Sequence, residues 1–153
     1  MSIHVFDAYI CITYLKKQSM KPTHIEHIGI AVNDLSEAIK YYEEVLGLKC
    51  YAIEEVADQH VKTAFFRVGD TKIELLESTD PEGPLGKYIE KKGPGVHHIA
   101  FAFDNVGDAL KNAADKGVQL IDHEPRKGAE GLKIGFLHPR STFGVLTEFC
   151  GEI

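Results

Sequence analysis

The 153-residue sequence has little of several features that define whole classes of protein. It has three cysteines, and no CxxC or Cys/His cluster links them, which excludes a disulfide framework and a zinc knuckle. Isolated thiols are typical of a reduced, cytosolic protein. Lysine and arginine number 17 against 23 aspartate and glutamate residues, and the net charge of −6 argues against non-specific nucleic-acid binding. No apolar run approaches the ~20 residues needed to cross a bilayer, so no membrane partner is expected.

The composition is that of an ordinary globular domain. Apolar residues make up 44% and charged residues 26% of the chain, which is enough to bury a core without disulfides. Residues 3–15 lack a basic leading region and a small-residue cleavage site, so a signal peptide is not expected. Met20-Lys21-Pro22 is a second plausible start. We therefore predict an N-terminal extension over residues 1–23, of unassigned function, and a single domain over 24–153.

The sequence contains an internal repeat. Residues 27–49 match 98–120 in pattern, at an offset of 71 residues. Each half opens with His-Ile at the start of a strand-like apolar run, followed by an Asn/Asp pair suited to capping a helix. Helical periodicity then runs over 35–46 in the first half and 106–114 in the second, each ended by a glycine.

Three strand-like runs follow each helix. They cover 49–55, 61–68 and 71–77 in the first half, and 118–122, 132–137 and 144–150 in the second. Residues 80–95 are rich in Gly, Pro and Lys and are predicted to be a linker between a first module (about 24–79) and a second (about 96–150). A module of this size cannot cover both faces of its sheet alone. We therefore predict an α+β fold with two tandem βαβββ modules that form one curved mixed sheet around a cavity.

The repeat places imidazole and carboxylate groups at equivalent points. His27 and His98 each open a first strand, and Glu74 and Glu148 each lie in a last strand. Singly, such residues are usually structural or solvated, but duplication of the pair favours a site. Imidazole with carboxylate suits a divalent ion such as Co, Ni, Zn or Mn. His97 directly precedes His98 and is predicted to face the other side of its strand.

The sequence resembles the vicinal oxygen chelate superfamily and, within it, the methylmalonyl-CoA epimerases. The resemblance covers about residues 24–150. It is carried by HIGIAV at 27–32, YYEEVLGL at 41–48, GDTKIELLE at 69–77, GVHHIAF at 95–101, GLKIGFLHPR at 131–140 and GVLTEF at 144–149.

The resemblance implies a reaction and roles for the site residues. The reaction is interconversion of (2R)- and (2S)-methylmalonyl-CoA through a metal-stabilised enolate. The implied metal ligands are His27, His98 and Glu148, with Glu74 as the fourth. Glu148 is expected to be one catalytic base. Thr63 stands where some relatives have a second glutamate. Either Glu74 or a water therefore serves the opposite face, or the two-glutamate scheme does not transfer to this chain, and the sequence leaves the second base open.

The resemblance also implies partners. An acyl-CoA substrate requires cations for its phosphates, and Lys127, Lys133 and Arg140 flank a loop of the second module. A solvated basic surface explains these three residues equally well. Family membership further implies a homodimer, and the isolated thiols predict that it is cytoplasmic.

Two other functions fit the same scaffold. Lactoylglutathione lyase (glyoxalase I) shares the His/Glu ligand set, but its relatives carry Arg and Asn where this chain has Ala31 and Ser78. A non-catalytic small-molecule binding protein is the second alternative. Such proteins generally lack a complete set of ligands, which argues against it.

Overall fold

The computed structural model describes residues 20–152, so residues 1–19 of the extension predicted over 1–23 lie outside the described residues. Over these residues the chain forms eight strands and three α-helices. The elements are β1 (Ile25–Ala31), α2 (Leu35–Glu44), β2 (Cys50–Val56), β3 (Val61–Val68), β4 (Thr71–Ser78), α3 (Pro84–Lys92), β5 (Gly95–Ala102), α4 (Val106–Asp115), β6 (Arg126–Lys127), β7 (Lys133–Leu137) and β8 (Thr147–Gly151). Within the described part, no helix has the length and apolar character needed to cross a membrane.

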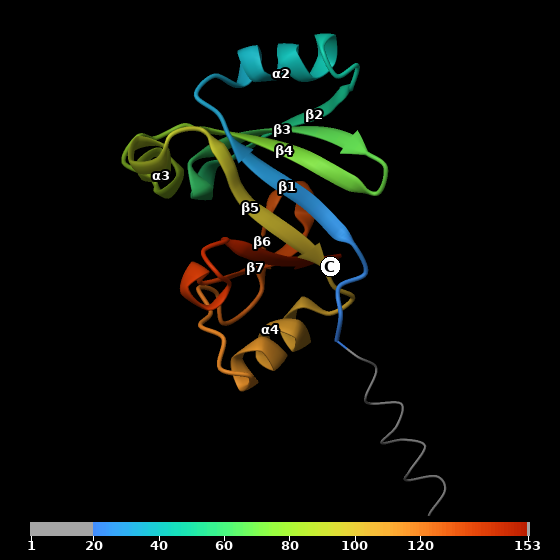
Figure 1. Ribbon diagram of the computed structural model, residues 1–153, viewed down its shortest axis with the longest axis vertical. Coiled ribbons are helices and arrows are strands. Elements are labelled where there is room, and N and C mark those ends of the chain that lie inside the picture. The colour runs from blue at the N-terminus through green and yellow to red at the C-terminus, as the bar shows by residue number, and fades with distance from the viewer. Residues whose placement is uncertain (1–19, 153) are drawn as a thin grey trace, which may run out of the picture.

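All eight strands form one curled sheet, in the order β2-β3-β4-β1-β5-β8-β7-β6 (Figure 1). Within each half, the first strand pairs with the last in parallel, β1 with β4 and β5 with β8. The antiparallel pair β1–β5 joins the halves at the centre of the sheet. The predicted α+β fold with a curved mixed sheet is confirmed.

Helices α2 and α4 begin in the same way and cover the outer face of the sheet near opposite ends of the molecule (Figure 1). The Asp34 side chain accepts a hydrogen bond from the Glu37 amide, and Asn105 accepts one from the Asp108 amide, each at 2.9 Å. Such caps satisfy amides that have no partner within the helix. Leu35 of α2 packs against Phe66 and other residues of β3 and β4. Residues on the alternate positions of these strands therefore face the concave side.

Two segments differ in secondary structure from what the sequence pattern suggests. The predicted linker at 80–95 contains helix α3, whose Leu85 packs against the β1–β4 side of the sheet. The strand predicted at 118–122 is reduced to one bridge, between Leu120 and Leu137. The amides of Ile121 and Asp122 both donate to the same carbonyl, that of Phe136, so a ladder does not continue. The sixth strand lies further on, at β6.

Candidate functional site

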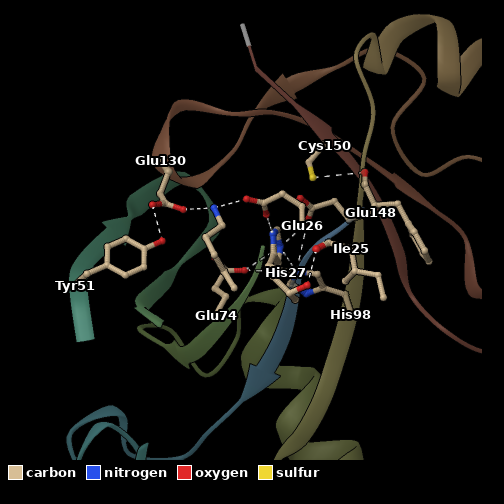
Figure 2. Close-up of polar contacts among 12 residues, drawn as sticks. Ile25, Glu26, His27, Tyr51, Glu74, His98, Glu130, Glu148 and Cys150 are labelled. Atoms are coloured by element: carbon tan, nitrogen blue, oxygen red, sulfur yellow. Dashed lines mark hydrogen bonds and ion pairs between the residues drawn. The ribbon is translucent and has the colours of Figure 1, made fainter. Parts of the chain in front are cut away.

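Four side chains meet on the concave face where the two modules join (Figure 2). His27 comes from β1 and His98 from β5, and their Nε2 atoms lie 2.9 Å apart. Glu74 of β4 places Oε2 at 3.2 Å from the His27 Nε2 and 3.5 Å from the His98 Nε2. Glu148 of β8 places Oε2 at 3.7 and 3.4 Å from the same two atoms. Each module thus contributes one imidazole and one carboxylate.

The donor set fits a divalent metal ion. Ligand atoms about 2.1 Å from one shared ion lie about 3.0 to 3.4 Å from one another. The two Nε2 atoms lie 2.9 Å apart, and the carboxylates lie 3.2 to 3.7 Å from them, close to that range. All four residues are buried, with between 3% and 7% of their surface exposed. Imidazole together with buried carboxylate suits a divalent ion such as Co, Ni, Zn or Mn. Their role as ligands stays a prediction.

The residue that precedes each of these two histidines in the sequence contacts its Nδ1 atom. Glu26 accepts a hydrogen bond from the His27 Nδ1, and the His97 Nδ1 lies 2.9 Å from the His98 Nδ1. The pairing of β1 with β5 is irregular at both preceding residues. Glu26 is an extra residue in β1, because Ile25 and His27 pair with consecutive residues of β5. His97 is likewise an extra residue in β5, because His98 and Val96 pair with consecutive residues of β1. A bulge of this kind re-aims a side chain. A partner on Nδ1 leaves Nε2 oriented toward the site.

The prediction that His97 faces away from the site is therefore wrong. The register shift breaks the strict alternation of side chains along β5, and His97 lines the same cavity as His98. Its ring packs edge-on against Tyr88 of α3, with the centroids 4.6 Å apart. Burial, together with the adjacent His98, lowers the pKa of His97 to about 4, so the ring is neutral at physiological pH.

The carboxylates dominate the electrostatics of the site. Burial alone would lower the pKa of His27, but the hydrogen bonds and charges of Glu148, Glu26 and Glu74 outweigh burial and raise it to about 10. Burial opposes the charged form of Glu74 as well, yet His98 and His27 lower its pKa. The site without metal is therefore a set of mutually stabilising charges, and a cation bound there would take the place of the proton on His27.

A cavity of about 550 Å³ extends from this cluster along the concave face. Most of its wall is apolar, with residues such as Phe65, Leu76, Ile134 and Phe136. Two cationic side chains, Lys72 and Arg126, also line it. The Glu130 side chain, from the short helix Ala129–Gly131 that follows β6, reaches across to Lys72 of β4 and Tyr51 of β2. This contact joins the two ends of the curled sheet (Figure 2).

The other predicted site residues lie apart from this cluster. Thr63 lines the cavity, is 1% exposed, and its hydroxyl donates to the Glu54 carbonyl at 3.2 Å. Lys127 and Lys133 pair across β6 and β7 and point to solvent, and Arg140 is exposed on the short helix Pro139–Ser141. None of these three cations is among the residues that line the cavity. Their role toward CoA stays a prediction.

Sequence reasoning missed Glu26, Lys72 and Glu130. Lys72 had a signal, because it lies two residues before Glu74 and so shares its face of β4. The sequence carried no such signal for Glu26, because strict alternation along a strand would place its side chain on the opposite face from His27. Glu130 reaches Lys72 only because the sheet curls, and its distance of 58 residues along the chain hides the contact.

Known proteins are similar to this chain over most of its length. Residues 26–136 match the family described as the Glyoxalase/Bleomycin resistance protein/Dioxygenase superfamily. An uncharacterized Bacillus subtilis protein, YqjC, is 47% identical over 126 residues, which cover 82% of this chain and 90% of that protein. The mitochondrial methylmalonyl-CoA epimerase of Mus musculus is 32% identical over 125 residues, covering 81% of this chain and 70% of that enzyme.

A solved structure agrees closely with this fold. It is a variant of Streptomyces coelicolor methylmalonyl-CoA epimerase in complex with 2-nitronate-propionyl-CoA. The two chains are 37% identical, with a TM-score of 0.83 over 86% of this chain and 95% of the other.

Proposed function

The chain belongs to the glyoxalase/bleomycin resistance protein/dioxygenase superfamily, and from this premise we propose that it interconverts (2R)- and (2S)-methylmalonyl-CoA with the help of a divalent metal ion. Similarity to named epimerases over about four fifths of the chain makes it an enzyme of the epimerase type. The observation that carries the proposal is the convergence of His27, Glu74, His98 and Glu148 at one end of a largely apolar cavity.

The four converging side chains would hold the ion, which is Co, Ni, Zn or Mn. When bound, the ion supplies positive charge that stabilises an enolate developing at the thioester. His27 and His98 keep their Nε2 atoms directed at it because Glu26 and His97 hold the opposite ring nitrogens. The apolar wall of the cavity excludes water, which strengthens every charge interaction within it.

Epimerisation requires proton transfer on two faces of C2. Glu148 is the base in this proposal: its carboxylate is buried on the module 2 side of the cavity and takes the C2 proton from one face. Thr63 does not serve as its counterpart, because its hydroxyl is an ordinary donor to the Glu54 carbonyl. Glu74 is the repeat equivalent of Glu148 on the module 1 side and serves the other face.

The CoA portion extends out of the cavity in this proposal. Lys127, Lys133 and Arg140 present exposed positive charge on the module 2 surface, where phosphate groups can be bound without desolvating the cations. The proposal includes a homodimer in the cytoplasm. The free thiols of Cys50 and Cys150 are consistent with a reducing compartment.

Deuterium wash-in tests this function. The metal-loaded chain is incubated with (2R)-methylmalonyl-CoA in D2O, and C2 labelling and the 2S epimer are followed by mass spectrometry and chiral analysis. We expect labelling with epimerisation, and loss of both in Glu148→Gln. Labelling without epimerisation would mean that only one face is served and that Glu74 is not a second base. An absence of labelling with each of the four metals would overturn the proposal, and hemithioacetal isomerisation would then be assayed.

A further inference from the structure

A chain of polar contacts runs along the cavity wall and ends at His27 (Figure 2). The Tyr51 hydroxyl donates to the Glu130 carboxylate at 3.0 Å, and Glu130 pairs with the ammonium of Lys72. The same ammonium pairs with Glu26, which accepts a hydrogen bond from the His27 Nδ1. The chain therefore links the short helix that follows β6 to the ring nitrogen opposite the one proposed to bind metal.

The charged groups of this chain are shielded from water. The side chains of Lys72, Glu26 and Glu130 are 7%, 15% and 26% exposed. Lys72 lies beside His27 in the parallel pairing of β1 with β4, and both residues line the cavity. Charges in such surroundings are weakly screened, so a change in one partner is felt strongly by the next. Glu130 is the most exposed of the three charged groups and the one that comes from the second module.

Two groups of the chain divide their interaction between two partners. Lys72 has one ammonium for two carboxylates, and Glu26 has one carboxylate for the ammonium and the imidazole. The hold of Glu130 on Lys72 therefore decides how much of the Glu26 charge is left for His27. A carboxylate that is less neutralised is a stronger acceptor, and the ring that it orients is a stronger metal ligand.

The second half of the repeat holds its histidine in a different way. The group that contacts the His98 Nδ1 is the His97 ring, which packs against Tyr88 with the centroids 4.6 Å apart. This ring is neutral at physiological pH, because burial and the adjacent His98 lower its pKa to about 4. The two halves therefore differ, with a charged partner behind His27 and a neutral one behind His98.

We propose that Lys72 and Glu130 are positioning residues that set, through Glu26, how tightly His27 binds the metal ion. The inference rests on the proposed function for the identity of the site, and it goes further by giving a role to two residues outside the ligand set. Glu130 belongs to module 2 and His27 to module 1. The affinity of the metal site thus depends on a contact between the two ends of the curled sheet.

The affinity of the full chain for Zn²⁺, measured by isothermal titration calorimetry, separates this role from a structural one. We expect Glu130→Gln to weaken binding by about tenfold, the lower end of the range for outer partners of a metal ligand, because Lys72 then pairs with Glu26 alone and draws it away from His27. We expect Lys72→Met to tighten binding several-fold, because the whole charge of Glu26 is left to the imidazole. Loss of packing would weaken binding in both variants, so the opposite signs are diagnostic.

Two matched controls change charge outside the chain. Asp58→Asn removes an exposed carboxylate that lines the same cavity, and Lys62→Met removes an exposed cation from β3. Both are expected to leave the Zn²⁺ affinity unchanged. In a Glu26→Gln background, adding Glu130→Gln or Lys72→Met should cause no further change, because the link to His27 is already cut. A further change in that background would mean that the charges act through space, and would overturn the inference.

A second measurement needs no metal. The Nδ1 proton of His27 in the metal-free protein reports the hydrogen bond to Glu26, and its NMR resonance is expected to move downfield in Lys72→Met and upfield in Glu130→Gln. Glu130 is partly exposed, so Glu130→Gln is expected to fold and is decisive if Lys72→Met does not. Affinities or resonances that move the same way in both variants, or that do not move, would overturn the inference. A wild type that binds no metal but shows the two opposite shifts would overturn the proposed function, while the link from Glu130 to His27 would stand.

Discussion

Gly29 faces the His98 ring across the β1–β5 pair, and any side chain at this position would displace the ring. A Cβ added at Gly29 would lie 2.2 Å from the His98 Cε1, far inside van der Waals contact. The glycine is needed for space and not for an unusual backbone conformation. The position of one imidazole of the site is therefore set by the absence of a side chain on the opposite strand.

We predict that Gly29→Ala lowers the affinity for Co²⁺ or Zn²⁺ by at least about tenfold, because the His98 ring must move off the site. Metal competition with a chromophoric chelator measures this. Gly107→Ala is the matched control, since its added Cβ would meet its nearest neighbour at an ordinary 3.5 Å. Equal metal affinity in both variants would show that His98 is not held by this contact.

A second prediction about a single residue concerns the protonation of His27. Its pKa of about 10 in the folded, metal-free protein lies above the ordinary 6.5. The interaction with the carboxylates therefore stabilises the folded state fully below about pH 6.5, and this stabilisation is lost as the pH rises through about 10. Imidazole NMR resonances of the metal-free protein should give a His27 midpoint near 10, absent from the spectrum of His27→Gln. A midpoint near 6.5 would contradict the prediction.

How well single residues could be predicted depended on whether they obey the repeat. His27, His98, Glu74 and Glu148 stand at matching points of two modules, and the structure brings these four together. His97 was misplaced because a register shift overrides strand alternation. Bulges arise from the pairing of two strands, so one strand's sequence does not reveal them.

Helix α3 shows the corresponding limit for whole elements. Leu85, Tyr88 and Ile89 have the spacing of a helix face and pack against the β1–β4 side of the sheet. The surrounding glycines and prolines favoured a linker instead, although Pro84 lies at the first turn, where proline is tolerated. In contrast, α2 and α4 were predicted to within two residues because periodicity, an N-terminal cap and a terminating glycine agreed there.

If α3 is a packed element, removing its anchor should destabilise the fold. We predict that Leu85→Ala lowers the free energy of unfolding by about 2 to 4 kcal/mol, because Leu85 is almost fully buried and its loss leaves a cavity. Urea denaturation followed by circular dichroism measures the change. Lys87→Ala, on the exposed side of the same helix, is expected to have little effect. A small and equal effect of the two changes would show that the packing of α3 does not contribute to the stability of the fold.

At the scale of the whole molecule, the site is shared equally between the modules. If a metal ion is bound by two residues from each half, as proposed, it would stabilise the folded state only when both halves are folded. We predict one thermal transition that shifts to higher temperature with saturating Zn²⁺ and back on chelation, whether followed by calorimetry or by hydrogen exchange in β3 and in β7. Two transitions, of which one responds to metal, would show that the halves bind it separately.

Within residues 20–152, the outermost strands of the curled sheet are β2 and β6, and both are poor templates for aggregation. β6 is two residues long, too short to recruit another strand. β2 carries Glu54 and Glu55 on its length, and the amide of Glu130 donates to the Glu54 carboxylate. Charge and cover of this kind discourage strand addition from a second molecule. Glu130, which lines the cavity, therefore also covers part of the β2 edge. A variant that frees the 128–132 segment is expected to be less soluble at high concentration.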